Sequence, residues 1–233
     1  MKVALVHDWL TGLRGGERVL EQLCLLYPEA DIFTLIYVPG SCGPIIERHR
    51  IRASFLDRLP KRSYRHYLPL FPVAIESFDL SAYELVISTS HAVAKGCRPG
   101  KHAVHVAYIH TPMRYVWDQF DAYFGEGRAG TLTRIAAAAL APLLRRWDVR
   151  STARAHGLVA NSRFVAGRIR RYWNREADAV ALDDGPGRAF QVQQREDVRL
   201  GIEQAELLEH ALAAAQAGEP VVHQGDPHPA ASR

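Results

Sequence analysis

Short apolar runs that alternate with helical patterns constrain the fold of this chain more than any other feature of its sequence. The runs are rich in aliphatic and β-branched residues and mostly end next to polar residues; they lie at residues 2–7, 31–37, 84–88, 103–109 and 157–161. Apolar residues at helical spacing separate several of them, first at residues 17–26. This alternation predicts an α/β fold, a Rossmann-like parallel sheet with helices on both faces.

The pattern changes near residue 177. We expect residues 1–177 to form one Rossmann-like domain. Residues 178–217 are a divergent segment, in which a short final strand and one amphipathic helix at residues 196–217 are predicted. Residues 218–233 are rich in Pro, Gly and His, and this composition predicts a disordered tail.

Composition and cysteine usage exclude several classes of protein. With 233 residues, 48% of them hydrophobic, the chain can bury a core of its own. The N-terminal apolar run is too short for a signal peptide, and the longest apolar stretch, residues 135–144, has about half of the roughly 20 residues that a membrane-spanning helix needs. The three cysteines are scattered without CxxC spacing, so we expect no metal site, no disulfide framework and a cytoplasmic location.

A basic segment rich in aromatic residues lies at residues 47–72. The structural interpretation of this segment is a solvated face whose aromatic rings pack inward. The functional alternatives are a surface that docks on an anionic membrane and a surface that binds RNA. RNP, KH and zinc-knuckle patterns are absent, so we expect no nucleic-acid partner. The preference for a membrane rests mostly on what the family resemblance below implies. The candidate membrane-facing residues are Arg50, Arg52, Lys61 and Arg62.

Small and polar residues follow four of the five apolar runs. Ligands of an open parallel sheet bind beyond the carboxyl ends of its strands, so these residues are expected to share one edge of the sheet. In chain order they are His7, Asp8, Gly15 and Gly16; Thr89, Ser90, His91 and Lys95; His110, Thr111 and Pro112; and Asn161, Ser162 and Arg163.

Gly15 and Gly16 lie just before the first predicted helix and have two interpretations. A backbone without Cβ atoms at a helix N-terminus lets a phosphate approach the N–H groups. Alternatively, the pair forms a tight turn that needs positive φ. The spacing is neither GxGxxG nor GxxxxGK[ST], which argues against an NAD-dependent oxidoreductase and a P-loop NTPase.

His110 is the candidate catalytic residue. It precedes Thr111 and Pro112, and the proline biases Thr111 toward an extended backbone that holds this strand end over the edge of the sheet. A histidine there can donate a hydrogen bond to a substrate hydroxyl; the alternative is a structural histidine. The neighbouring histidines lack metal-ligand spacing, and the G-x-S-x-G elbow of a serine hydrolase is absent.

Four long motifs occur in order: MKVALVHDWLTGLRGGERVLEQLCLLYPEADIFTLIY, FDLSAYELVISTSHAVAKG, AYIHTPMRYVWDQFDAYFG and RWDVRSTARAHGLVANSRFVAGRIRRYW. Together they resemble the N-terminal domain of family 4 retaining glycosyltransferases, especially bacterial mannosyltransferase-like members of polysaccharide and lipopolysaccharide pathways. The resemblance covers residues 1–177. It implies one half of a GT-B enzyme, in which two Rossmann-like domains face each other across a cleft.

The resemblance also implies an activity. A hexose, with mannose the expected sugar, passes from a nucleotide sugar such as GDP-mannose to a glycan or lipid-linked acceptor. The expected location is the cytoplasm, at the inner face of the plasma membrane. No metal and no cofactor are expected, because Arg and Lys side chains stabilise the leaving phosphates in this family.

Residue roles follow from the same resemblance. Gly15 and Gly16 match the glycine loop near the donor diphosphate and the acceptor. His110, in the HTP motif, matches the catalytic histidine near the transferred sugar. The remaining expected substrate-binding residues lie in further loops that face the cleft: Ser90, His91, Thr111, Asn161, Ser162 and Arg163.

After Glu176 the sequence departs from the family pattern. In the family, the cationic residues, an E-x7-E motif and the pocket for the nucleoside base belong to a C-terminal domain, which we do not find after this point. We therefore expect this chain to be inactive alone, through a truncation, a frame shift or a split enzyme whose second half is a separate chain. The alternative is a non-catalytic module that binds a membrane or an acceptor lipid through residues 47–72.

Overall fold

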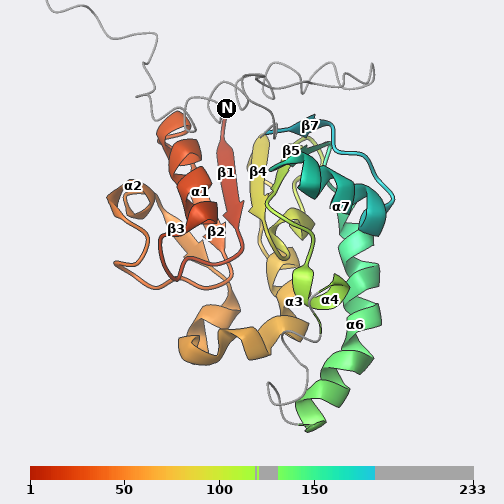
Figure 1. Ribbon diagram of the computed structural model, residues 1–233. Helices are drawn as coiled ribbons and strands as arrows, with labels where there is room; N and C mark the ends of the chain where they lie inside the picture. The colour runs from red at the N-terminus through yellow and green to blue at the C-terminus, as the bar shows by residue number, and fades with distance from the viewer. Residues whose placement is uncertain (119, 121–130, 182–233) are drawn as a thin grey trace, which may run out of the picture.

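The computed structural model describes residues 1–118, 120 and 131–181 (Figure 1). The helix expected at residues 196–217 and the tail expected at residues 218–233 lie outside this part. Within it the chain forms a seven-stranded sheet, composed of β1 (Val3–His7), β2 (Asp31–Thr34), β3 (Ile51–Ala53), β4 (Leu85–Ser90), β5 (Val104–Ile109), β6 (Gly157–Ala160) and β7 (Ala179–Val180).

All neighbouring strands of the sheet are parallel, and their order is β3-β2-β1-β4-β5-β6-β7. The chain first winds outward from β1 to β3, and then starts again at β4 on the other side of β1. This reversal is the defining feature of a doubly wound sheet. The predicted α/β fold with a Rossmann-like parallel sheet is confirmed.

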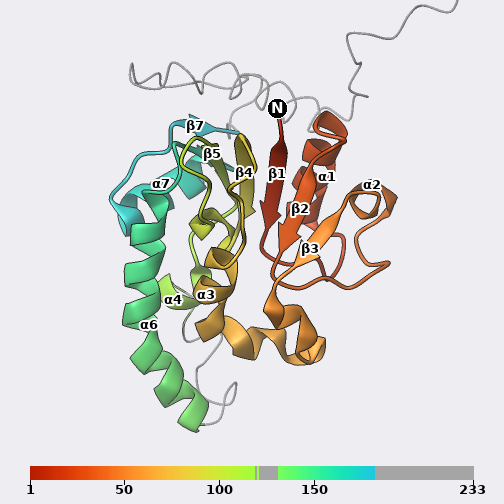
Figure 2. The same cartoon turned by 180° about the vertical axis from the view of Figure 1, so that it is seen from behind.

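Helices cover both faces of the sheet (Figures 1 and 2). One face packs against α1 and α2, and the other against α3, α4, α6, α7 and the 3₁₀ helix η3. Their bounds are α1 (Gly15–Leu26), α2 (Pro44–Glu47), α3 (Phe71–Glu76), η3 (Ala94–Gly96), α4 (Arg114–Trp117), α6 (Thr131–Thr152) and α7 (Arg163–Trp173); two further 3₁₀ helices are η1 (Phe55–Arg58) and η2 (Lys61–Leu70).

The core lies on both sides of the central strands, because successive side chains of a strand point to opposite faces. On one side Leu5 and Ile87 pack in the same cluster as Leu20 of α1. On the other side Val86 packs in the same cluster as Phe71 of α3. Each fully buried side chain of this size contributes about 1.5–3 kcal/mol, so the two layers fix the register of the strands between them.

Local signals explain where α7 begins and ends. The Ser162 hydroxyl accepts a hydrogen bond from the backbone N–H of Val165 at 3.3 Å, which satisfies a free donor of the first turn. Asn174 ends the helix in the left-handed region, with a φ of 50°. The helix predicted from the pattern SRFVAGRIRRYW is therefore confirmed.

Several boundaries differ from the sequence-based expectation. β2 ends at Thr34 rather than at residue 37, because the backbone then turns to donate from Leu35 to the carbonyl of Asp8 at 3.1 Å. β3 was not expected, since it lies inside the basic segment 47–72. β7 pairs with β6, so the sheet extends past residue 177. None of the helices in the described ranges is both long and apolar enough to cross a bilayer.

Candidate functional site

The strand order brings the four expected polar loops to one edge of the sheet. β1, β4, β5 and β6 are consecutive and parallel, so their carboxyl ends lie together, at the lower edge of the strands in Figure 1. We call this edge the rim and define it as residues 7–8, 15–16, 89–91, 110–111 and 161–163. The expectation that these loops share one edge is confirmed.

Gly15 and Gly16 are the first two residues of α1. The interpretation that they form a turn with positive φ is wrong, because in the described part of the chain only Gly40 and Gly43 among the glycines have positive φ. A Cβ atom at Gly16 would lie 3.5 Å from Nε2 of His110, whereas a Cβ atom at Gly15 would meet open space. The first N–H groups of α1 therefore lie beside the candidate catalytic histidine.

His110 lies at the end of β5 among other rings of the rim. Its ring centroid is 6.4 Å from that of His91 and 5.0 Å from that of Tyr108. Burial, together with the neighbouring His7 and His91, lowers the pKa of His110 to about 3. Within the described residues its Nε2 atom is buried and has no hydrogen-bond partner. At neutral pH the rim thus presents an uncharged imidazole with one free nitrogen.

Asp8 ties the loop after β4 to the end of β1. The side chain is fully buried. Its carboxylate accepts four backbone hydrogen bonds, from the N–H groups of His91, Ala92, Val93 and Ala94 at 2.7, 2.9, 2.7 and 2.7 Å. Burial raises the pKa of Asp8, but His91, His7 and these N–H groups lower it by more, so the pKa lies below its usual value. The loop is therefore built around a buried carboxylate.

The ring of His91 lies against the same carboxylate. Its Nδ1 atom is 3.1 Å from Oδ2 of Asp8, and its side chain is 26% exposed. The ring meets the indole of Trp9 edge-on, with centroids 4.3 Å apart. Burial lowers the pKa of His91, and Asp8 only partly opposes this shift. His91 is thus an uncharged imidazole at neutral pH, held by Asp8 and partly open to solvent.

His7 links the end of β1 to both β4 and α1. Its Nδ1 atom lies 2.6 Å from Oγ1 of Thr89, and its Nε2 atom lies 3.9 Å from Oε1 of Glu17. Glu17 also accepts a hydrogen bond from the backbone N–H of Arg14 at 3.0 Å, at the start of α1. Burial raises the pKa of Glu17, but His7 and nearby N–H groups lower it by more. A carboxylate therefore lies close to both the N-terminus of α1 and the ring of His7.

Two of the expected substrate-binding residues bond to the protein itself. The Thr111 hydroxyl donates to the carbonyl of Pro112 at 3.0 Å, and the Ser162 hydroxyl caps α7. Ser90 is buried, and its carbonyl accepts a hydrogen bond from the backbone N–H of His110, directly after β5, at 2.9 Å. These residues shape the loops of the rim.

Asn161 and Arg163 lie at the far side of the rim, after β6. Oδ1 of Asn161 accepts a hydrogen bond from the hydroxyl of Tyr108 at 2.6 Å, which leaves the side-chain amide free to donate. Arg163 is exposed on the first turn of α7. The structure thus brings His110 and the expected substrate-binding residues to one edge of the sheet.

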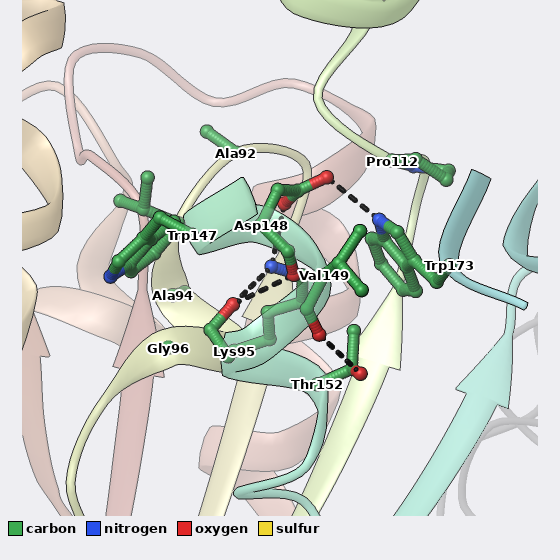
Figure 3. A network of polar contacts seen from close by, with 12 residues as sticks. Ala92, Ala94, Lys95, Gly96, Pro112, Trp147, Asp148, Val149, Thr152 and Trp173 are labelled. Atoms are coloured by element: carbon green, nitrogen blue, oxygen red, sulfur yellow. Dashed lines mark hydrogen bonds and ion pairs between the residues drawn. The ribbon is translucent and has the colours of Figure 1, made fainter. Parts of the chain in front are cut away.

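Lys95, expected on the rim, is buried instead in a polar network between η3, α6 and α7 (Figure 3). Its Nζ atom lies 2.7 Å from Oδ1 of Asp148 and donates to the hydroxyl of Ser151 at 2.8 Å. Oδ2 of Asp148 accepts from the indole nitrogens of Trp117 and Trp173, both at 2.7 Å. The network anchors the end of the loop that begins with His91.

Three of the four candidate membrane-facing residues, Arg50, Arg52 and Lys61, have described side chains. Arg50 precedes β3 and is exposed at the amino edge of the sheet, opposite the rim. Arg52 pairs with Asp31 at 3.2 Å, and Lys61 pairs with Asp57 at 2.9 Å.

The side chain of Arg62 lies outside the described part. Most aromatic residues of the segment 47–72 pack inward, as its structural interpretation predicts. Tyr64 and Tyr67 pack against the core cluster that contains Phe71, whereas Phe55 is exposed.

Asp8 was expected on the rim without a role, and Glu17 was not expected at the site. A signal for Asp8 is its position directly after an apolar strand, since a buried charge must be paired or hydrogen-bonded. The signal for Glu17 is weak, because acidic residues are common in the first turn of any helix. In the part of the chain that the structure describes, no group of three or more His, Cys, Asp or Glu side chains is placed to hold a metal ion.

Comparison with known proteins agrees with the resemblance of the motifs. The family model described as Glycosyltransferase Family 4 matches residues 13–182. No curated protein matches the sequence. Among solved structures, the apo form of the lipopolysaccharide outer core galactosyltransferase WaaB is similar at 13% identity and a TM-score of 0.42, over 78% of this chain and 45% of that chain, so this chain spans less than half the length of that structure. Because the family model matches well over half of its residues, the chain belongs to glycosyltransferase family 4.

Proposed function

We propose that this protein takes part in the transfer of a hexosyl group from a nucleotide sugar to a glycan or lipid-linked acceptor, with retention of configuration. Membership of glycosyltransferase family 4 supports this proposal. The observation that carries it is the meeting of the α1 N-terminus with His110 at Gly16, where a Cβ atom would lie 3.5 Å from the imidazole. An anion and a sugar hydroxyl can be bound side by side at such a place.

The N-terminus of α1 is the proposed site for the donor diphosphate. The N–H groups of Gly15 and Gly16 have no partners within the helix, and the helix dipole adds positive potential at that end. During transfer, the bond between the sugar and the diphosphate breaks, and the acceptor hydroxyl forms the new bond on the same face. The departing diphosphate gains charge, so donors fixed beside it lower the barrier.

His110 is the proposed partner of the transferred sugar. Because its pKa lies at about 3, it is neutral at physiological pH and can donate a hydrogen bond to a sugar hydroxyl. It would not act as a cation toward the phosphates. We propose that cationic side chains for the phosphates, and the pocket for the nucleoside base, come from a second Rossmann-like domain on this or another chain, as the family resemblance implies.

The phosphate site is tested by a single methyl group. In Gly16→Ala the new Cβ atom meets His7 and His110 at ordinary contact distance, 3.5 Å, so the variant is expected to fold. The methyl group would cover the N–H groups of α1, and we expect binding of GDP, measured by calorimetry, to weaken about tenfold or more. Gly157→Ala is the control, since Gly157 has open space around it at the amino end of β6. Equal GDP affinity in Gly16→Ala and wild type would contradict the proposed diphosphate site at the N-terminus of α1.

Transfer itself is tested with a set of nucleotide sugars. GDP-mannose is the proposed donor, and UDP-galactose and UDP-glucose are the competitors. The protein is incubated with each donor and with bacterial glycolipid acceptors. The incubation is done with and without any second domain encoded nearby. The masses of the products are measured by mass spectrometry. With the second domain present, we expect a hexose to be added and His110→Ala to abolish the addition; without it, we expect no addition. A His110→Ala variant that retains full transfer would exclude the catalytic role.

We also propose that the protein is cytoplasmic and docks on the inner face of the plasma membrane. The supporting observation is a set of exposed apolar residues beyond the carboxyl edge of the strands, with Phe55 44%, Leu70 43% and Val73 60% exposed. In a pelleting assay with anionic vesicles, we expect Phe55→Ser combined with Leu70→Ser to lose binding. Arg50→Glu, at the opposite edge of the sheet, is the matched control. Equal pelleting of all three proteins would argue against docking through this segment.

A further inference from the structure

One buried carboxylate, that of Asp148 in α6, is bound by residues from three other elements. Oδ1 lies 2.7 Å from Nζ of Lys95 in η3. Oδ2 accepts from the indole nitrogens of Trp117, at the end of α4, and of Trp173, at the end of α7, both at 2.7 Å. Figure 3 shows the contacts with Lys95 and Trp173. Both oxygens are used, so an amide, which has a single acceptor oxygen, cannot replace the carboxylate.

The elements that meet at Asp148 all come from the rim. η3 follows the loop after β4, α4 follows the end of β5 with His110, and α7 follows the loop after β6. A buried ion pair is often no more stabilising than apolar residues of similar volume. Its hydrogen bonds are directional, however, so each of them fixes where one element lies. The loops after three neighbouring strands are thus tied to one side chain.

The segment from His110 to Trp117 is short and has little freedom. The backbone N–H of His110 donates to the carbonyl of Ser90 at 2.9 Å, so the sheet holds the start of the segment. Within the segment, Pro112 has a fixed φ and Met113 is buried in the core. The position of the Trp117 indole therefore determines how the chain leaves β5 at the candidate catalytic histidine.

Further contacts hold the same end of α4 against α7. Oδ1 of Asp118 accepts from Nη2 of Arg168 at 3.0 Å, and Oδ2 of Asp118 lies 2.9 Å from Nη1 of Arg168. The ring of Trp117 stacks on that of Tyr172, with centroids 4.9 Å apart. A helix of four residues is not stable by itself. These contacts and the Asp148 carboxylate therefore keep α4 in place.

We infer that Asp148 positions the His110 imidazole at the rim by binding Trp117, and that it is thereby a positioning residue for the transfer reaction. The hydrogen bond to Trp117 fixes the segment that follows His110 and, with it, the direction in which the imidazole points. The inference rests on the proposed function for the role of His110 in transfer, but the placement of the ring can be measured without it.

The placement of His110 is measured by NMR of the full chain labelled with ¹³C-histidine. The His110→Gln variant identifies the ring signals by their loss. The rings of Tyr108 and His91 have centroids 5.0 and 6.4 Å away, so a small displacement of the imidazole changes its chemical shifts. We expect Trp117→Phe, which removes the indole N–H, to move the His110 signals.

Trp173→Phe is the matched control. It removes the other indole N–H from the same oxygen of Asp148, at a side chain that is only 4% exposed, so it disturbs the fold at least as much. Urea denaturation of both variants checks their stability. We expect Trp173→Phe to leave the His110 signals at their wild-type positions. Signals that move equally in both variants, or in neither, would overturn the inference.

A second variant keeps the test decisive if Trp117→Phe does not fold. Lys95→Met combined with Asp148→Leu removes the acceptor of the Trp117 indole and leaves no unpaired charge in the core. We expect the His110 signals to move in this variant as well. Wild-type His110 signals in the folded double variant would also overturn the inference.

Transfer, assayed with the second domain present, separates the inference from the proposed function. We expect Trp117→Phe to lower the rate of transfer about tenfold or more, because a misplaced group loses its contact with the reacting sugar. Trp173→Phe should transfer at the wild-type rate. If the His110 signals move in Trp117→Phe but transfer is unchanged, the positioning of the ring stands and the proposed role of His110 fails. If the signals stay in place, the inference fails whatever the rate of transfer.

Discussion

Gly96 is the glycine at which the described part of the fold leaves the least room for a side chain. A Cβ atom there would lie 2.5 Å from Cη2 of Trp147 and 3.3 Å from Cβ of Ser151. The indole cannot move away freely, because its Nε1 atom donates to Glu76 at 2.6 Å and its ring packs beside Nζ of Lys95. We expect Gly96→Ala to lower the free energy of unfolding by about 1–3 kcal/mol, measured by urea denaturation.

The matched control for this residue is Gly167→Ala. Gly167 lies inside α7, and a Cβ atom there would meet open space. Alanine has the higher helix propensity, so this variant is expected to be more stable than wild type by about 0.5–1 kcal/mol. If Gly96→Ala were as stable as Gly167→Ala, Trp147 would have another position available and the steric argument would be wrong.

At the scale of the elements, the Lys95–Asp148 pair holds η3 against α6 and α7. Both side chains are buried, so loss of either charge leaves the other uncompensated. We expect Asp148→Asn to cost about 3–5 kcal/mol of unfolding free energy, because the Lys95 ammonium then lacks its counter-charge. Urea denaturation of Asp148→Asn, Lys95→Met and the double variant gives the coupling energy of the pair. The double variant should cost clearly less than the sum of the single variants, and additive costs would refute the coupling.

The elements also show how far the sequence alone leads. Five apolar runs were enough to predict β1, β2, β4, β5 and β6, as well as the edge where His110 and Gly16 meet. The short final strand, β7, was predicted separately in the divergent segment. β3 was not predicted, because it is a short strand at the edge of the sheet and its sequence lies among arginines. The roles of Asp8 and Lys95 depend on partners more than 50 residues away in sequence, so no local pattern reveals them.

At the scale of the whole molecule, stability depends on pH because folding buries histidines in their neutral form. Burial lowers the pKa of His105 to about 4 and that of His110 to about 3, from an ordinary value of 6.5. The unfolded chain takes up protons on these rings as the pH falls below 6.5, while the folded chain does not. Their contribution to stability is therefore fully present above pH 6.5 and is lost as the pH falls through the folded-state values. Because the pKa of Asp8 is lowered in the folded state, Asp8 adds a further loss of stability only as the pH falls below 3.8, the ordinary pKa of an aspartate.

His105 gives the sharpest test of this pH dependence. It is fully buried in β5, with Nε2 2.9 Å from the hydroxyl of Ser88. A shift from 6.5 to about 4 corresponds to a loss on the order of 3 kcal/mol between those pH values. We expect the unfolding free energy of wild type, from urea denaturation at a series of pH values, to fall more steeply over this range than that of His105→Gln, by about that amount. His102→Gln, at an exposed position, should follow wild type. Parallel curves for wild type and His105→Gln would mean that the buried ring is protonated without cost to the fold, which contradicts its position in an apolar strand.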